Sequence, residues 1–182
     1  IVFDGKDITS IPERQLKPFR RKIQMVFQDP YESLNPRMTI HDIVAEPLHI
    51  QGGLSPSEID KKVYKSLEDV ELIPPEEFIT RFPHELSGGQ RQRIGVARAL
   101  TLEPEFIVAD EPVSMLDVSI RAEVLNLLVD LKERLQVSFL YITHDLALAR
   151  HTCDKVAIMY LGKIVEQGQV ESLMFEPLHP YT

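Results

Sequence analysis

The octapeptide LSGGQRQR, residues 86–93, decides how the rest of this sequence is understood. Two adjacent glycines, Gly88 and Gly89, stand between Ser87 and a run of residues that predicts a helix. Glycines let the backbone approach a ligand closely and adopt dihedral angles that a side chain would forbid. The start of a helix also offers unpaired N–H groups and the positive end of its dipole, so this stretch indicates a phosphate site. Taken alone, the same residues also fit a surface helix capped by Ser87.

A second motif, FIVADEP at residues 106–112, follows the predicted helix. Its continuous apolar run predicts a strand that is buried on both faces. Asp110 and Glu111 stand at the carboxyl end of this strand, where open parallel sheets bind ligands. Adjacent acids on an extended chain point in different directions, so one can hold Mg²⁺ while the other faces a nucleophilic water. An ordinary acidic loop after a strand is the alternative when this pair is considered alone.

The order and distance of these two motifs resemble those of ABC-type ATPases, and the resemblance covers nearly all 182 residues. It implies an α/β fold: a P-loop NTPase-like ABC ATPase core, with a mainly parallel sheet and flanking helices, plus an inserted α-helical subdomain. The N-terminal part of the core would be missing. Residues 1–27 and 103–182 would belong to the core. Residues 28–102 would form the Q-loop and the helical subdomain that ends in the signature motif.

The resemblance also assigns roles to single residues. Asp110 would be the Walker B residue that holds Mg²⁺, and Glu111 would be the general base. Gln28, at the end of a predicted strand over residues 23–27, would reach both Mg²⁺ and the attacking water. His144, directly after a predicted strand over residues 138–142, would be the switch histidine that contacts the γ-phosphate. Five further residues are expected to bind ATP from the side opposite Gln28 and Glu111, or along the junction between two subunits: Ser87, Gly88, Gly89, Gln90 and Asp117. Asp117 fits a helix N-cap equally well.

A longer and more specific resemblance is found in the segment FQDPYESLNPR, residues 27–37. It is similar to the corresponding loop in the ATPase subunits of oligopeptide and dipeptide importers. It implies ATP and Mg²⁺ as cofactors and a second ABC ATPase subunit, identical or paralogous, that meets the first head to tail. It also implies transmembrane permease subunits and, indirectly, a peptide-binding protein. Met115 departs from the family pattern, in which alanine is more frequent at this position.

The phosphate-binding loop G-x-x-x-x-G-K-[ST] does not occur in this sequence. Neither of the two Gly-Lys pairs, at residues 5–6 and 162–163, has the upstream glycine or the following hydroxyl residue. We therefore expect the chain to be part of a longer protein. We also expect the 182 residues alone to bind ATP weakly or not at all and not to hydrolyse it.

The amino-acid composition limits the cellular compartment and the binding partners that we expect for this chain. The net charge of −8 argues against broad nucleic-acid binding. The single cysteine, Cys153, excludes an internal disulfide and fits a reducing cytosol. No apolar run approaches the roughly 20 residues that a spanning helix needs. We expect a peripheral protein at the cytoplasmic face of the cell membrane, docked to another subunit.

Three alternatives remain beside peptide import. An ABC ATPase that acts on DNA or ribosomes is disfavoured, because the chain is acidic and the segment between Gln28 and Ser87 is short. A non-catalytic interaction module is supported by the missing phosphate loop, whereas the presence of Asp110, Glu111 and His144 argues against it. A nickel importer shares these motifs and stays open.

Local patterns predict most of the remaining elements. Residues 39–50 predict a helix that Pro47 should end or kink, and residues 55–58 form a capping box that begins the next helix. An apolar stripe from Ile120 to Leu135 predicts a helix against the sheet. Residues 155–160 and 163–167 predict a hairpin, followed by a short helix over residues 170–175.

Overall fold

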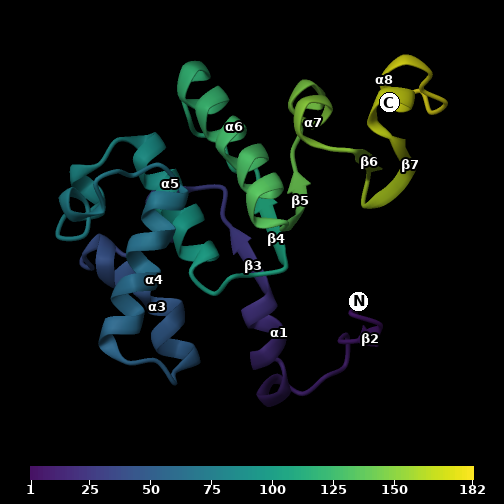
Figure 1. Cartoon of the computed structure of the whole chain (residues 1–182). Coiled ribbons are helices and arrows are strands. Elements are labelled where there is room, and N and C mark those ends of the chain that lie inside the picture. Colours follow the sequence, from purple (N-terminus) through teal and green to yellow (C-terminus); the bar gives the residue numbers. More distant parts are fainter. The chain divides into compact units, whose positions relative to one another are not determined.

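The computed structural model describes all 182 residues and divides into two compact units, Ile1–Leu140 and Tyr141–Thr182. Figure 1 shows the elements in sequence colours. The main sheet has three strands in the order β3 (Ile23–Val26), β4 (Phe106–Asp110) and β5 (Ser138–Ile142). β3 and β4 are parallel, with Val26 opposite Ala109, so their carboxyl ends lie at the same edge. This confirms the α/β class predicted from the sequence.

The first residues form a small hairpin. β1 (Val2–Phe3) pairs antiparallel with β2 (Lys6–Asp7) across a two-residue turn. Asp4 has a φ of 50° and Gly5 a φ of 73°, the positive angles that a tight hairpin turn requires at both central positions. The short helices η1 (Glu13–Gln15) and α1 (Lys17–Lys22) then lead into β3.

Burial along the two parallel strands is less complete than the sequence predicted. In β4, Ile107 and Ala109 are buried while Phe106, Val108 and Asp110 are only half-buried, so burial alternates instead of covering both faces. In β3, Val26 is buried and Met25 is exposed. Successive side chains of a strand point to opposite faces of the sheet, so the alternation in β4 shows that one face is covered less than the other. The prediction of fully buried strands was therefore wrong.

Three helices of the first unit contact one another: α3 (Ile40–Gln51), α4 (Pro56–Asp69) and α5 (Gly88–Leu100). The predicted capping box is present at Ser55, whose hydroxyl accepts from the Glu58 amide. Pro47 lies inside α3, so of the two predicted outcomes, an end or a kink at this residue, the end does not occur. The helix continues because its buried face, which includes Ile43 and Leu48, holds the turns on both sides of the proline. The connecting helices are α2 (Pro30–Ser33), η2 (Pro75–Glu77) and η3 (Pro83–Glu85).

α6 (Val118–Leu135) buries the middle of its predicted stripe. The buried residues are Val124, Leu125, Leu127, Leu128 and Leu131. The helix ends at Gln136, which adopts the left-handed conformation with a φ of 53°.

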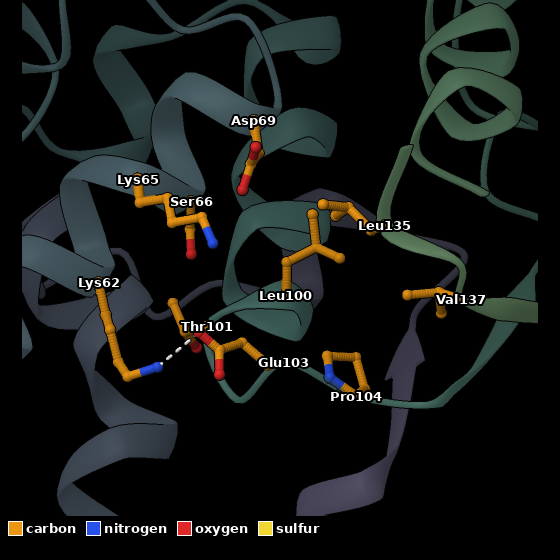
Figure 2. A pocket seen from close by; sticks show the side chains of 10 residues that line it. All are labelled: Lys62, Lys65, Ser66, Asp69, Leu100, Thr101, Glu103, Pro104, Leu135 and Val137. Atoms are coloured by element: carbon orange, nitrogen blue, oxygen red, sulfur yellow. Dashed lines mark hydrogen bonds and ion pairs between the residues drawn. The ribbon is translucent and has the colours of Figure 1, made fainter. Parts of the chain in front are cut away.

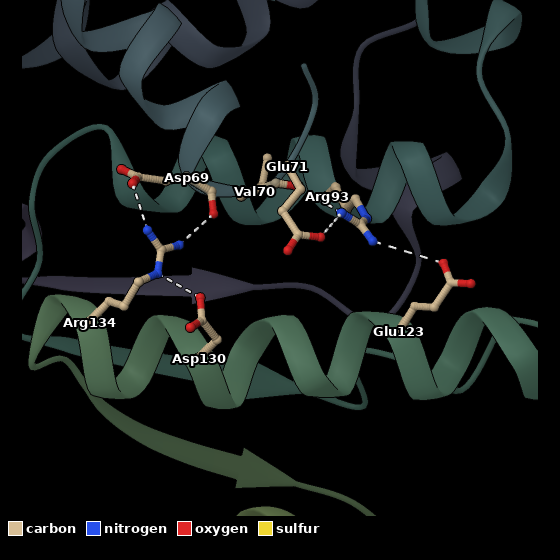
Figure 3. A network of polar contacts seen from close by, with 7 residues as sticks. All are labelled: Asp69, Val70, Glu71, Arg93, Glu123, Asp130 and Arg134. Carbon is tan, nitrogen blue, oxygen red and sulfur yellow. Dashed lines mark hydrogen bonds and ion pairs between the residues drawn. The ribbon is translucent and has the colours of Figure 1, made fainter. Parts of the chain in front are cut away.

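Two arginines tie the end of α4 to its neighbours (Figure 3). Arg93 of α5 donates to the Val70 carbonyl at 3.0 Å and to the Glu71 carboxylate at 2.8 Å. Arg134 of α6 donates to the Asp69 carbonyl at 3.0 Å and to the Asp130 carboxylate at 2.6 Å. The last carbonyls of α4 thus receive guanidinium donors from two different helices, which satisfies part of the helix end.

The second unit contains α7 (Leu146–Thr152), β6 (Lys155–Tyr160), β7 (Lys163–Gln169) and α8 (Val170–Phe175). β6 and β7 form the predicted antiparallel hairpin, and α8 has the predicted bounds. None of the helices in either unit combines the length and the apolar character that crossing a membrane demands.

Candidate functional site

The carboxyl edge of the β3–β4 pair brings two predicted site residues together. Gln28 stands two positions after β3, and Glu111 directly follows β4. The Gln28 side-chain amide donates to the Glu111 carboxylate, with 2.8 Å between Nε2 and Oε2. The two residues are 83 positions apart in the sequence, so the parallel register of the strands is what aligns them. Asp110, the last residue of β4, is half-buried beside them in the chain.

Glu111 has an uncommon backbone conformation for a residue that follows a strand. Its φ is 40°, a region that non-glycine residues seldom occupy. A turn holds it there, since the Glu111 carbonyl accepts from both the amide and the hydroxyl of Ser114, each at 3.1 Å. Backbone strain of this kind persists where the surroundings enforce it, and it is concentrated at functional sites. The turn therefore orients the Glu111 carboxylate away from the direction that a continuing strand would give it.

The start of α5 has the capping box that the sequence allowed as an alternative for this stretch. The Ser87 hydroxyl accepts from the Gln90 amide at 3.3 Å, and the Ser87 amide donates to the Gln90 side chain at 3.0 Å. Since the box satisfies the amides of Ser87 and Gln90, the amides of Gly88 and Gly89 are the first-turn donors left without an intrahelical acceptor. The cap and an anion site are compatible at this helix start.

The glycine pair has a packing role that the sequence did not reveal. Gly88 and Gly89 lie in the first turn of α5, and neither has a positive φ, so the expectation that they adopt angles forbidden to other residues was wrong. A Cβ at Gly89 would stand 2.5 Å from Cγ2 of Ile120 in α6. A Cβ at Gly88 would meet Leu116 at 3.4 Å and the Tyr31 hydroxyl at 3.7 Å. Gly89 is therefore required where α5 approaches α6.

α5 also holds the segment that carries Gln28. The Arg91 guanidinium lies over the Tyr31 ring, 4.1 Å from its centroid, and its Nε donates to the Pro83 carbonyl at 2.6 Å. Arg98 donates to the Ser33 carbonyl at 2.8 Å. Sequence reasoning missed these contacts. The available signal was the spacing of seven between Arg91 and Arg98, which puts both on one face of a helix, although it does not say what that face meets.

The other predicted site residues are placed as follows. Asp117 occupies the N-cap position of α6 with an exposed side chain that makes no capping hydrogen bond. His144 belongs to the second unit, where it is exposed and precedes Asp145, the N-cap of α7. The Asp145 carboxylate accepts from the Ala147 amide at 2.9 Å. A shared site for His144 and Glu111 stays a prediction.

Gln28 and Asp110, at the carboxyl edge of the sheet, can bind a magnesium ion only together with a further ligand. No group of three or more His, Cys, Asp or Glu side chains is arranged to hold a metal by itself. A carboxylate and an amide oxygen are nevertheless the hard donors that Mg²⁺ prefers, and this ion is commonly held by one or two carboxylates together with substrate phosphates. The hydrogen bond from Gln28 Nε2 leaves Oε1 as its donor atom to a metal.

A separate pocket of about 230 Å³ lies elsewhere in the first unit (Figure 2). It is bounded by α4, the end of α5 and the end of α6, and the Lys62 ammonium at its rim donates to Glu103 at 2.8 Å. Gln28, Asp110 and Glu111 are not among its lining residues. The pocket is therefore distinct from the strand edge.

Comparison with known proteins gives both a family and relatives. The family model described as ABC transporter matches residues 1–114. A putative peptide import ATP-binding protein of Brucella ovis is 54% identical over all 182 residues, which correspond to 57% of its own length. The oligopeptide transport ATP-binding protein AppF of Bacillus subtilis is 52% identical over the whole chain, which covers 55% of that protein. The chain thus spans little more than half the length of these relatives.

A solved structure shares the fold. It is a dimeric post-hydrolysis state of the ATP-binding cassette MJ0796 bound to ADP and Pi. It superposes with a TM-score of 0.78 and 31% sequence identity, over 92% of this chain and 72% of the other.

Proposed function

The chain belongs to the ABC transporter family, and we propose that it carries part of an ATPase site that powers the import of oligopeptides or dipeptides. The observation that carries the proposal is the hydrogen bond between Gln28 and Glu111 at the carboxyl edge of two parallel strands. The peptide-import names of relatives about 50% identical over the whole chain support the cargo class.

In the proposed reaction, Glu111 is the general base. Its carboxylate accepts a proton from the water that attacks the γ-phosphate of ATP. The Gln28 side-chain amide donates to one oxygen of this carboxylate at 2.8 Å and so orients it. Asp110 and the Gln28 carbonyl oxygen are the proposed ligands of Mg²⁺, which when bound neutralises phosphate charge.

In this proposal, the start of α5 at Gly88 and Gly89 contacts the nucleotide from the side opposite the subunit that holds it. The free amides of Gly88 and Gly89, with Ser87 and Gln90 beside them, suit a phosphate that another surface already holds. We propose that a second ATPase subunit supplies that surface, head to tail, with Asp117 close to the junction. The dimeric state of the ATP-binding cassette MJ0796, bound to ADP and Pi, supports the presence of a second subunit.

The remaining assignments complete the proposal. His144 would donate a hydrogen bond to the γ-phosphate. Residues 28–102 would form the inserted helical subdomain between core segments 1–27 and 103–182. The intact protein would lie at the cytoplasmic face of the membrane with permease subunits, supplied by a peptide-binding protein.

Uptake measurements in cells test the cargo. A strain that lacks the intact protein should lose uptake of labelled oligopeptides or dipeptides, and the wild-type gene should restore it. A gene carrying Glu111→Gln should not restore it, since transport depends on hydrolysis. Peptide uptake that continues without the protein, with nickel uptake lost instead, would replace this cargo by nickel.

A further inference from the structure

We propose that Arg98 is a positioning residue, which fixes Gln28 against Glu111 by holding both ends of the segment that carries Gln28. This inference rests on the proposed ATPase function and adds a residue to it. Arg98 lies near the end of α5, ten positions after Gly88, and is not one of the residues expected to touch the nucleotide. Its role would be to act through the Gln28 segment alone.

The guanidinium of Arg98 contacts the segment on either side of Gln28. On the carboxyl side, Nη1 donates to the Ser33 carbonyl at 2.8 Å. On the amino side, the group lies over the ring of Phe27, 6.0 Å from its centroid, and Phe27 directly precedes Gln28. A planar guanidinium can donate a hydrogen bond and stack on an aromatic face at the same time, which an ammonium does less well. One side chain thereby spans residues 27–33.

At its amino end the Gln28 segment continues from Val26, the buried last residue of β3, and the two residues after Val26 are exposed. Gln28 itself is exposed, and the Phe27 side chain is 46% exposed. Further along, Asp29 caps α2 by accepting from the Tyr31 amide at 2.6 Å, and Pro30 and Leu34 are buried. These contacts order the middle and the far end of the segment. The contact of Arg98 with the Phe27 ring adds a side-chain contact at the residue next to Gln28.

The surroundings of Arg98 make this clamp stiff. Burial lowers the pKa of the Arg98 guanidinium, while the charge of Glu46 on α3 acts in the opposite direction. A half-buried cation gains from a well-placed acceptor, which here is the Ser33 carbonyl. Because Arg98 sits on α5, the helix that begins at Gly88, it also joins the Gln28 segment to the phosphate-facing helix start.

A double-mutant cycle on the intact protein separates positioning from general stabilisation. Arg98→Met should lower kcat for ATP hydrolysis about tenfold with KM for ATP little changed, because the loss displaces Gln28 and not the nucleotide. Gln28→Ala should lower kcat by a similar factor or more. The double variant should be no slower than Gln28→Ala, since Arg98 has nothing left to position.

Matched variants complete the design. Arg81→Met removes another arginine that lies over a phenylalanine, 5.4 Å from the Phe78 ring centroid, and it should leave kcat unchanged. Arg98→Lys, which keeps a donor for Ser33, should recover part of the lost rate. If Arg98→Met does not fold, as judged by circular dichroism, the same cycle run with Arg98→Lys decides the question.

The outcomes distinguish this inference from the proposed function. Multiplicative effects in the double variant, or a wild-type kcat for Arg98→Met, overturn the positioning role and leave the ATPase intact. A wild-type protein that hydrolyses no ATP in the assembled transporter overturns the proposed function and this inference with it. Non-additive loss confined to kcat supports both.

Discussion

Replacing Gly89 by alanine tests the close approach of α5 to α6. The new Cβ would stand 2.5 Å from Cγ2 of Ile120, whereas carbon atoms in contact normally lie about 3.5–4.0 Å apart. One of the two helices, or the Ile120 side chain, must therefore shift by about 1 Å. Such overpacking typically destabilises a protein by about 1–3 kcal/mol.

Two opposing effects set the expected magnitude. Alanine is a better helix former than glycine by up to about 1 kcal/mol, which partly offsets the clash. The net expectation for Gly89→Ala is a loss of about 1–2 kcal/mol in the free energy of unfolding. Gly88→Ala is the matched control, since its Cβ would meet Leu116 at an ordinary 3.4 Å while it gains the same helix propensity. Without a clash to offset that gain, Gly88→Ala should raise the free energy of unfolding by up to about 1 kcal/mol.

Urea unfolding of the intact protein, followed by circular dichroism, measures the difference through the midpoint concentration. Adding Ile120→Ala, which removes Cγ2, should make the Gly89→Ala change much less harmful than it is in the wild-type background. Equal midpoints for the Gly88→Ala and Gly89→Ala variants would refute the reasoning, and so would a Gly89→Ala penalty that Ile120→Ala leaves untouched.

The remaining stability predictions concern ionic contacts. Arg93→Met should lower the free energy of unfolding by about 2–3 kcal/mol, because the Arg93 side chain is only 15% exposed and its loss removes a donor from the Val70 carbonyl. Arg134→Met should lower it by about 1 kcal/mol or less, since the Arg134 side chain is 46% exposed. Thermal unfolding of the two variants checks this order, and a larger effect for Arg134→Met contradicts it. The hydrogen bond from Lys62 lowers the pKa of Glu103 below its ordinary 4.5, so the pair stabilises the fold above that pH and loses its effect as the pH falls through the lowered pKa. Glu103→Gln should thus be less stable than wild type at pH 7, and the difference should vanish in acid; a difference that persists there would contradict the assignment.

Strand patterns put Gln28 and Glu111 each at the end of a strand, and the resemblance to ABC ATPases put both on one side of a nucleotide. The structure brings the two side chains together because the carboxyl ends of parallel strands share an edge. Their roles at a nucleotide stay a prediction. The capping box at Ser55 was predictable from the sequence, since all of its partners lie within four residues.

Packing between distant segments was not predictable in the same way. Gly89 is needed because a Cβ at this position would clash with Ile120, a residue of another helix. Arg98 donates to a backbone carbonyl 65 positions away in the sequence. Pro47 remained inside α3 because buried neighbours outweighed its local preference. The alternating burial in β4 depends on which elements cover each face of the sheet, and the sequence of a strand does not predict that.

The most direct measurement of the central claim is the ATPase rate of the intact protein carrying Glu111→Gln. The amide keeps the shape of the side chain but cannot accept the proton from water, and a general base contributes about 10²–10⁴-fold to a rate. We predict that hydrolysis falls at least about a hundredfold while ATP affinity stays within about threefold of wild type. Hydrolysis at the wild-type rate would contradict the account, because the carboxylate that Gln28 holds would then have no part in the reaction.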